Sequence, residues 1–245
     1  MTAPVSAPAV VGAVSKSPRV ERIGAAELWL ADCREVVDAM TGADALVSDP
    51  PFGISGGSGG DARDYAKGDY AAQGWEDTEQ YIADVCVPVL SALVAGVKRA
   101  AITPGTRCLH LYPRPADIGC FFAPAAMTHG PWGFVNFHPI LLYGRDFRAG
   151  KGALPTGRVV TEAAEKNGHP CPKPERAWRW LVDEASQQGE LVADPFMGSG
   201  TTGVVCATTG RRFVGTEIEP AYYDIARRRI ERAYRQADLF VQVPA

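Results

Sequence analysis

The segment Asp49-Pro50-Pro51-Phe52 places two hydrogen-bond acceptors and a flat ring directly after an apolar stretch. An amine conjugated to an aromatic ring is a poor nucleophile, and acceptors for both of its N–H groups draw the nitrogen toward tetrahedral geometry. The Asp49 carboxylate and the Pro50 carbonyl can serve as these acceptors, because two prolines hold the backbone in place. Phe52 offers a stacking face. The segment predicts a planar-amine pocket with Asp49, Pro50, Pro51 and Phe52 as catalytic residues; the alternative is a turn that only ends a strand.

A glycine loop for a nucleotide-like cofactor is the second chemical feature. Gly198-x-Gly200-x-x-Gly203 lies between a predicted strand at residues 190–193 and a predicted helix at 201–209. A tight turn at the carboxyl end of a strand brings backbone N–H groups and a helix N-terminus close to a ligand. Glu217 follows about 20 residues later, where a carboxylate that binds ribose hydroxyls is expected.

Two cofactor classes fit this loop. Its spacing matches the dinucleotide pattern, so a nicotinamide-dependent oxidoreductase is an alternative. However, Asp194 ends the preceding strand, and we expect its carboxylate at the mouth of the loop, where it suits a cationic sulfonium and would repel a pyrophosphate. The loop also lies near the C-terminus, whereas a dinucleotide fold usually begins with it. These two details favour S-adenosylmethionine.

Alternating strands and helices must position both segments. Such alternation is typical of an α/β fold, with a largely parallel sheet and helices on both faces. Asp77-x-x-Gln80 resembles a capping box that begins a helix, and Pro88 should bend or divide that helix. We expect strands at residues 27–31, 45–48, 99–103, 134–143, 190–193 and 212–216, and helices at residues 33–40, 77–94, 174–185, 201–209 and 220–233.

Size and composition favour one globular domain. The 245 residues are 46% hydrophobic and 22% charged, as in soluble globular proteins. Residues 1–18 are rich in Ala, Pro, Val and Ser and predict a disordered tail, which leaves residues 19–245 as the domain. No apolar run reaches the roughly 18 residues of a membrane helix, so no membrane partner is expected. Six cysteines without a CxxC pair predict reduced thiols and a cytoplasmic protein, and the histidines lack metal-ligand spacing.

A basic segment interrupts this otherwise acidic chain. The net charge of −3 argues mildly against strong non-specific DNA binding, but only local charge matters at an interface. Residues 144–168 are glycine-rich and weakly periodic, which predicts a loop inserted between core elements. A solvated surface is one interpretation of its basic residues. Their place in a loop favours the other, which is phosphate contact by Arg145, Arg148, Lys151 and Arg158.

In these residues the chain resembles the amino DNA methyltransferases, which methylate adenine N6 or cytosine N4. The resemblance covers residues 28–233. Asp49-Pro50-Pro51-Phe52 is similar to the catalytic motif of that family, with Phe in place of the commoner Tyr. Asp194, Phe196, Gly198, Ser199, Gly200, Thr201 and Thr202 are similar to its cofactor loop. His169 and Lys173 resemble the family's segment that closes over the methionine end of the cofactor. Asp32 resembles the acid that reaches the adenine of the cofactor, and Glu217 resembles the acid that binds its ribose.

The resemblance implies a fold, a reaction and partners. With the catalytic motif first and the cofactor loop second, the chain resembles the beta group, a circularly permuted form of the Rossmann-like methyltransferase fold. Strands from the two ends of the chain should then meet in the sheet. The implied reaction transfers a methyl group from S-adenosylmethionine to a flipped-out base in double-stranded DNA. Adenine N6 is favoured because the motif begins with Asp, and cytosine N4 is the alternative. A non-catalytic DNA-binding relative is a more remote alternative, and a homodimer is also implied.

Overall fold

The computed structural model of the chain describes residues 18–53, 77–122, 128–130, 133–145, 157–159 and 173–241. The expected N-terminal tail lies outside the described residues apart from Pro18. So does most of the predicted inserted loop at residues 144–168. Side chains are described for all of these ranges except residues 128–130, 133–134, 157–159 and 237–241.

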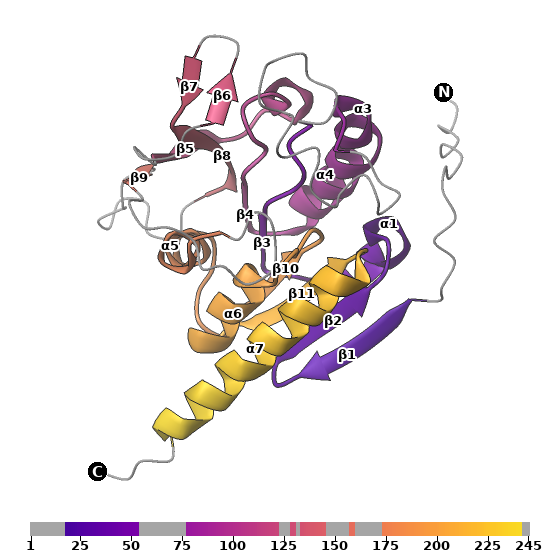
Figure 1. Ribbon diagram of the computed structural model, residues 1–245, viewed down its shortest axis with the longest axis vertical. Helices are drawn as coiled ribbons and strands as arrows, with labels where there is room; N and C mark the ends of the chain where they lie inside the picture. Colours follow the sequence, from indigo (N-terminus) through magenta and orange to yellow (C-terminus); the bar gives the residue numbers. More distant parts are fainter. Residues whose placement is uncertain are drawn as a thin grey trace.

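A nine-stranded sheet, in the order β1-β2-β11-β10-β3-β4-β8-β5-β9, forms the centre of the molecule (Figure 1). Its middle is parallel, as alternating strands and helices predict. The parallel strands, in their order across the sheet, are β2 (Ala26–Leu30), β11 (Arg212–Glu217), β10 (Leu191–Asp194), β3 (Ala45–Ser48) and β4 (Arg99–Ile102).

Strands from the two ends of the chain lie side by side in this sheet. In the parallel ladder of β2 with β11, Leu28 pairs with Gly215. In the ladder of β10 with β3, Ala193 pairs with Leu46. The two late strands β11 and β10 therefore lie next to each other between the early strands β2 and β3, which is the arrangement that the order of the two segments predicts.

Antiparallel strands extend the sheet at both edges. β1 (Arg19–Ile23) pairs with β2 at one edge. At the other, β8 (Phe137–Gly144) runs antiparallel to both β4 and β5 (Asp117–Phe122). β9 (Gly157–Val159) pairs with β5, and β6 (Thr128–Gly130) with β7 (Gly133–Val135) in a small separate sheet. The prediction of a loop throughout residues 144–168 was thus wrong at β9, where sheet pairing orders a short stretch without its own periodicity.

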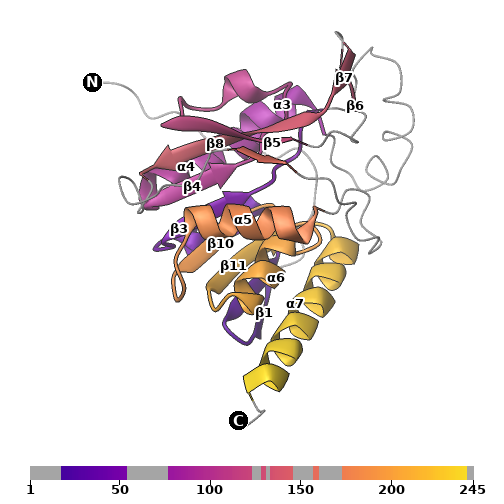
Figure 2. The same ribbon diagram turned by 90° about the vertical axis from the view of Figure 1, so that its left-hand side faces the viewer.

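Helices cover both faces of the sheet, each over its own hydrophobic core (Figures 1 and 2). One face carries α5 (Glu175–Ala185), α6 (Thr201–Thr208) and α7 (Pro220–Val241). The other carries α1 (Cys33–Val36), the 3-10 turn η1 (Val37–Met40) and a long helix made of α3 (Glu79–Tyr81), the π-helical η3 (Ile82–Cys86) and α4 (Val87–Gly96). A further 3-10 turn, η4 (Leu109–Leu111), follows β4.

The start of the long helix differs from the sequence prediction. Its N-cap is Thr78, whose hydroxyl accepts a hydrogen bond from the Tyr81 N–H, and not Asp77. Asp77 instead accepts a 2.5 Å hydrogen bond from the Gly53 N–H. Pro88, which lacks an N–H group, lies in the first turn of α4 directly after the π-helical segment, so the irregular turn accommodates it.

The same helix, Glu79–Gly96, is long and apolar enough to cross a membrane by length and composition alone. In the fold it is a core helix, because Ile82, Cys86, Leu90 and Leu93 are buried against the sheet.

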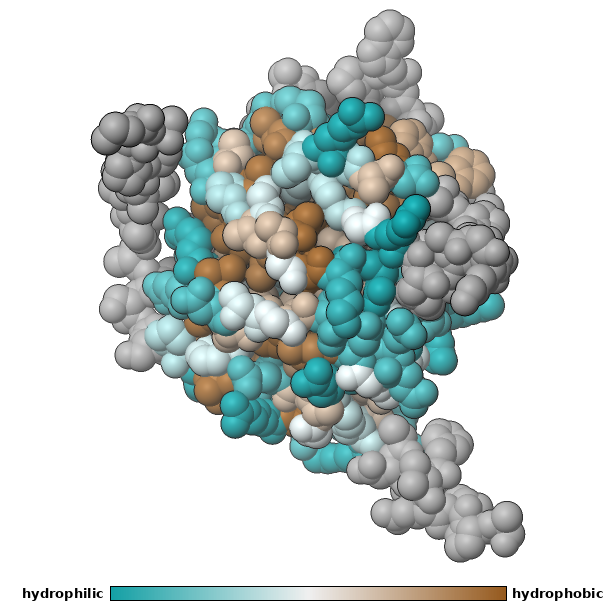
Figure 3. All heavy atoms as spheres, turned by 180° about the vertical axis from the view of Figure 1, so that it is seen from behind, coloured by the Kyte–Doolittle hydropathy of each residue, from teal (hydrophilic) through white to brown (hydrophobic). Residues whose placement is uncertain are grey.

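Viewed from behind, hydrophobic surface lies near the centre of the molecule among hydrophilic residues (Figure 3).

Candidate functional site

The candidate residues meet at the carboxyl edge of the parallel strands. Asp49 follows β3, Thr103 follows β4, Phe196 to Gly200 follow β10, and Glu217 ends β11. From β10 the chain continues through α6 to β11 on one side, whereas from β3 it continues through α3 and α4 to β4 on the other. The gap between β10 and β3 is therefore a topological switch point, where open α/β sheets bind their ligands.

A buried hydrogen-bond network joins the two central strands. The Asp194 carboxylate accepts from the Ser48 hydroxyl (2.8 Å), the Thr202 hydroxyl (2.6 Å) and the Phe196 N–H (3.1 Å). Trp178 of α5 donates its indole N–H to the Thr202 hydroxyl (2.9 Å). This network fixes β3, the glycine loop, α6 and α5 relative to one another.

The expectation that Asp194 faces the mouth of the loop was wrong. The residue is 2% exposed, and both carboxylate oxygens bind protein groups. Burial raises the pKa of Asp194 to about 7, although the hydrogen bonds from Thr202, Ser48 and Phe196 oppose this shift. The physical reason for the inward orientation is that β10 lies at the centre of the sheet, where Ser48 of β3 and Thr202 of α6 supply donors on both sides. Asp194 thus supports the loop through its hydrogen bonds with Phe196 and Thr202.

The glycine loop has the backbone conformation that its glycines permit. Gly198 and Gly200 have φ angles of 52° and 76°, in the left-handed region that favours glycine. A Cβ atom on Gly200 would lie 2.8 Å from the Cβ of Ala226, so α7 can pack closely against the start of α6 only because this residue is glycine. α6 begins at Thr201, directly after this loop, and the first N–H groups of a helix have no acceptor within the helix, so they can bind an anion.

Arg229 of α7 supports the loop from a distant part of the sequence. Its Nη1 donates to the Ser199 carbonyl (2.6 Å), the Ser199 hydroxyl (3.1 Å) and the Thr201 hydroxyl (3.2 Å). Ser199, Thr201 and Thr202 are all at most 5% exposed. The hydroxyls of these predicted cofactor residues therefore bind protein groups, and the loop offers its backbone to a ligand.

Glu217 is the partly exposed acid next to the loop. Its carboxylate accepts from the Glu219 N–H (2.8 Å) and is also hydrogen-bonded by the N–H groups of Ile218 and Gly198. Burial raises the pKa of Glu217 to about 7 against these hydrogen bonds. The contact with Gly198 joins the predicted ribose acid to the glycine loop.

Asp32 lies at the end of the neighbouring strand β2, as the N-cap of α1. Its carboxylate accepts from the Arg34 N–H (2.9 Å) and pairs with the Arg34 guanidinium (2.5 Å). Burial opposes ionisation of this group, but the Arg34 contacts outweigh it and hold the pKa of Asp32 below its usual value. Asp32 is thus an ionised acid at the same edge of the sheet as Glu217.

Asp49 has one partner on each carboxylate oxygen. The hydroxyl of the buried Thr103 donates to Oδ1 (2.5 Å). The Lys173 ammonium lies 2.7 Å from Oδ2, and the side chains of Lys173 and Asp49 are 22% and 21% exposed. The sequence placed Lys173 with the cofactor, whereas in the structure its ammonium contacts the predicted catalytic acid.

Phe52 forms one wall beside Asp49. The Lys173 ammonium lies 4.8 Å from the centroid of the Phe52 ring, and the His138 ring lies 6.2 Å from it at an angle of 35°. Gly105 packs against Phe52, since a Cβ there would come within 2.8 Å of the ring. Burial, followed by the nearby Lys173, lowers the pKa of His138, so this ring is neutral near pH 7. The surroundings of Asp49 therefore combine an acid, a cation and two flat rings.

The remaining predicted residues are only partly described. Pro50 is buried and Pro51 is half-buried behind Asp49. Arg145 is exposed just after β8. The backbone of Arg158 lies in β9, and its side chain is outside the described residues. His169, Arg148 and Lys151 also lie outside the described residues.

Several site residues were missed by sequence reasoning. Thr103, His138 and Arg229 carry no local motif, and only sheet order and helix packing bring them to the site. Ser48 was read only as the end of a buried strand, and Trp178 only as an apolar position of a helix. A sequence signal existed for Thr103 alone, because a polar residue at the carboxyl end of a strand next to β3 falls on the same edge as Asp49.

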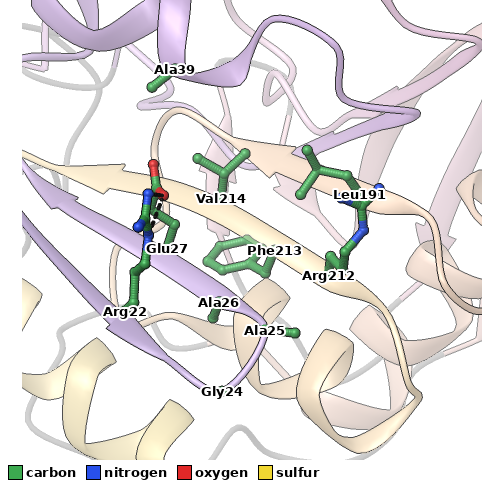
Figure 4. A pocket seen from close by; sticks show the side chains of 10 residues that line it. All are labelled: Arg22, Gly24, Ala25, Ala26, Glu27, Ala39, Leu191, Arg212, Phe213 and Val214. Carbon is green, nitrogen blue, oxygen red and sulfur yellow. Dashed lines mark hydrogen bonds and ion pairs between the residues drawn. The ribbon is translucent and has the colours of Figure 1, made fainter.

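A hollow lies at the amino ends of the parallel strands, away from the candidate site (Figure 4). Its lining includes the first residues of β2, β10 and β11, which are Ala26, Leu191 and Arg212. Arg22 and Glu27 form an ion pair there (2.9 Å). Because the amino ends of parallel strands point away from their carboxyl ends, this hollow is separate from the candidate site. Among the described residues, no group of His, Cys, Asp and Glu side chains could hold a metal ion.

A family model for DNA methylases matches residues 147–228. Over this segment the chain is similar to the DNA methylases. The matched segment contains Lys173, α5, β10, the glycine loop, α6, β11 and the first residues of α7. The family resemblance of the cofactor half of the sequence is therefore confirmed.

Curated relatives match stretches of 69 to 78 residues of the chain. The chain is 43% identical over 77 residues to the type II methyltransferase M2.DpnII of Streptococcus pneumoniae, which is 31% of this chain and 29% of that protein. It is 41% identical over 69 residues to the DNA adenine methyltransferase YhdJ of Escherichia coli strain K12, which is 28% of this chain and 24% of that protein. The chain thus spans less than a third of the length of the curated relatives that it matches.

Solved structures are similar over most of the chain. A crystal structure of an M1.HpyAVI–SAM complex aligns with a TM-score of 0.58 at 19% identity, over 84% of this chain and 98% of the other. The PvuII DNA methyltransferase, described as cytosine-N4-specific, aligns with a TM-score of 0.61 at 14% identity, over 88% and 93%. These similarities confirm the expected α/β methyltransferase fold. They include one enzyme described as cytosine-N4-specific, so the fold does not select the base.

Proposed function

We propose that this protein is an S-adenosylmethionine-dependent DNA methyltransferase that methylates the N6 amine of adenine. One observation carries the proposal: Asp49 and the glycine loop flank the same switch point, with β3 and β10 adjacent and joined by the bond from Ser48 to Asp194. A base-binding acid and a cofactor loop are therefore neighbours, although 148 positions separate Asp49 from Met197. The family match over the loop supports a methyltransferase over the dinucleotide alternative.

The residues at this edge fit S-adenosylmethionine. The N–H groups at the start of α6 and the backbone of residues 198–200 suit its carboxylate and sugar, and Glu217 can accept hydrogen bonds from both ribose hydroxyls. Asp32 is placed one strand farther along the same edge, where it can reach the adenine end. When bound there, the cofactor would supply a methyl group to the amine nitrogen, the N–C bond forming as the C–S bond breaks. The methylated nitrogen would then lose one proton, which the Asp49 carboxylate or solvent can accept.

The chain's own residues would orient the amine. Asp49 Oδ2 would accept one N–H of the base, and the Pro50 carbonyl would accept the other. With both N–H groups drawn toward tetrahedral geometry, the nitrogen lone pair is less delocalised into the ring and becomes available to the methyl carbon. Phe52 would stack on the base after it is flipped out of the duplex. The acceptors lie on a rigid backbone, so little reorganisation precedes reaction.

Adenine is the proposed base on two grounds. The catalytic segment begins with Asp, and the curated relative YhdJ is described as a DNA adenine methyltransferase. Cytosine N4 is the second candidate, favoured by the similarity to the PvuII enzyme.

Incubation with unmodified, amplified genomic DNA and methyl-labelled S-adenosylmethionine tests the proposal. We expect 6-methyladenine in the digested nucleosides by mass spectrometry, and sequencing of modified positions would give the recognition site. Asp49→Ala should lower kcat by about 100-fold or more, as for loss of a preorganised charge-stabilising group. Asp38→Ala, at an exposed acid of η1, is the matched control and should leave the rate unchanged. Exclusive 4-methylcytosine would replace adenine by cytosine as the substrate, and no methylated base at all would refute the proposal.

We propose that the partner of this protein is double-stranded DNA. The protein is proposed to be cytoplasmic and not to associate with membranes. Phosphate contacts are assigned to Arg145, Arg148, Lys151 and Arg158, and a lower salt dependence of DNA binding in their Ala variants would support that assignment. Free thiols at the described cysteines Cys33, Cys86, Cys108, Cys120 and Cys206 agree with a reducing compartment.

A homodimer is also proposed. Ile118, Phe122 and Phe137 are 38% to 55% exposed, and the register of β5 with β8 places them on one face of the sheet. Exposed large apolar side chains that share one face of a sheet are typical of interaction surfaces. Light scattering of the full chain in solution would test it, and a monomer at micromolar concentration would exclude the dimer.

A further inference from the structure

We propose that Thr103 is a positioning residue that orients the Asp49 carboxylate for methyl transfer. The inference rests on the proposed function, and it assigns separate tasks to the two carboxylate oxygens. Thr103 follows β4, the strand that pairs with β3, and is 1% exposed. Its N–H donates to the Ser48 carbonyl (3.1 Å), which continues the ladder of β3 with β4 beyond their last paired residues.

The Thr103 side chain has one strong acceptor. Its hydroxyl lies 2.5 Å from Asp49 Oδ1 and 3.4 Å from the Ser48 carbonyl oxygen. A β-branched side chain is stiff at χ1, so the direction of this hydroxyl is set by the strand. The carboxylate of Asp49 is 21% exposed and would otherwise rotate about its terminal bond, which has a broad torsional minimum. Thr103 therefore holds Oδ1 on the sheet side.

With Oδ1 held, Oδ2 faces the side of the site on which Phe52 lies. The position of Lys173 marks this direction, because its ammonium is 2.7 Å from Oδ2 and also 4.8 Å from the centroid of the Phe52 ring. An N–H donor beside Oδ2 and over the Phe52 ring has the same relation to both groups as the proposed target amine. Lys173 therefore occupies the place of the amine in the free protein and must move when a base enters. Thr103 stays with Oδ1 throughout.

Three variants of the full chain test the role of the Thr103 hydroxyl. Thr103→Val has nearly the same shape but cannot donate, Thr103→Ser keeps the donor, and Asp49→Ala removes the group that Thr103 orients. Each is assayed with S-adenosylmethionine and unmodified, amplified genomic DNA, together with thermal unfolding and the Kd for S-adenosylhomocysteine. We expect Thr103→Val to lower kcat by about tenfold or more with KM and Kd within about twofold, the pattern of an interaction that acts in the transition state. Thr103→Ser should recover most of kcat.

The outcomes separate this inference from the proposed function. A kcat unchanged in Thr103→Val, with an active unsubstituted protein, would overturn the role of Thr103 and leave the function standing. Equal losses of kcat in Thr103→Val and Thr103→Ser, with a lower melting temperature in both, would reduce Thr103 to a packing residue. A further loss of about tenfold when Thr103→Val is added to Asp49→Ala would also refute the inference, because a residue that acts through Asp49 has no effect in its absence. Failure of the unsubstituted protein to methylate DNA would instead overturn the function, and this inference with it.

Discussion

Ser48 donates a 2.8 Å hydrogen bond to Asp194 across 146 positions of the chain. Ser48 directly precedes the predicted catalytic acid, and Asp194 directly precedes the cofactor loop. A single buried contact therefore couples the two halves of the site. The contact also helps to hold the Asp194 side chain in place. Burial raises the pKa of this carboxyl group to about 7.

The first prediction concerns this contact. Asp194 has a pKa raised by burial to about 7 in the folded protein, against 3.8 for the ordinary group. Its ionisation therefore costs stability as pH rises from about 4 to about 7, and the cost is complete above that window. Ser48→Ala removes a donor from the ionised form, so it should destabilise the protein by about 1–3 kcal/mol at pH 8.5 and by less at pH 5.5. Urea unfolding at the two pH values measures the difference.

Ser186→Ala is the control for this variant. Ser186 is equally buried, but its hydroxyl donates to the Val182 carbonyl and accepts from the Arg211 guanidinium, rather than bonding to a carboxyl group. Its loss of stability should be the same at both pH values. An equal loss at both pH values in Ser48→Ala would show that Asp194 does not change charge in that range.

The second prediction is a pH-dependent cofactor affinity set by Glu217. Burial raises the pKa of Glu217 to about 7, and ribose hydroxyls need the ionised carboxylate as acceptor. Affinity for S-adenosylhomocysteine should therefore rise by up to about tenfold per pH unit below pH 7 and level off above it. Calorimetric titrations from pH 5.5 to 8.5 measure this. Glu217→Gln should bind more weakly at pH 8.5 and lose most of the pH dependence, whereas an unaltered pH profile would assign the titration to another group.

The third prediction uses two glycines with similar backbone angles. Gly200 and Gly42 have φ angles of 76° and 84°, but a Cβ at Gly200 would lie 2.8 Å from Ala226, whereas one at Gly42 meets nothing within 4 Å. Both alanine variants incur backbone strain of about 1–3 kcal/mol. Gly200→Ala should add about 1–3 kcal/mol for overpacking and should weaken cofactor binding, because it moves the loop. Thermal unfolding and the Kd for S-adenosylhomocysteine measure both. Equal effects of the two variants would contradict the close approach of α7.

The sequence could predict the site where its residues are contiguous and end a strand. Asp49, the glycine loop and Glu217 each follow an apolar stretch, and parallel strands bring their carboxyl ends to one edge, so their proximity follows from topology. The meeting of β2 with β11 followed in the same way from the order of the two segments. These predictions needed only local patterns and the direction of the strands.

The rest depends on contacts that no local pattern encodes. The inward turn of Asp194 requires donors from Ser48 and Thr202, and the orientation of Asp49 requires Thr103. Strands β1 and β5 were not expected, because the sequences RVERI and DIGCFF lack a regular alternation of apolar and polar residues. Both are ordered by pairing with a neighbour in the sheet, which is a tertiary effect.

The last prediction tests the support of the cofactor loop by α7. Arg229 donates to the Ser199 carbonyl at 2.6 Å and to the hydroxyls of Ser199 and Thr201. Hydrogen bonds from a charged donor contribute about 1.5–3 kcal/mol, so Arg229→Met should raise the Kd for S-adenosylhomocysteine by about tenfold or more. Arg228, one position earlier on the exposed side of α7, is the matched control, and Arg228→Met should leave the Kd unchanged. If both variants bind equally well, the glycine loop keeps its conformation without the Arg229 contacts, and its remaining contacts are sufficient to hold it.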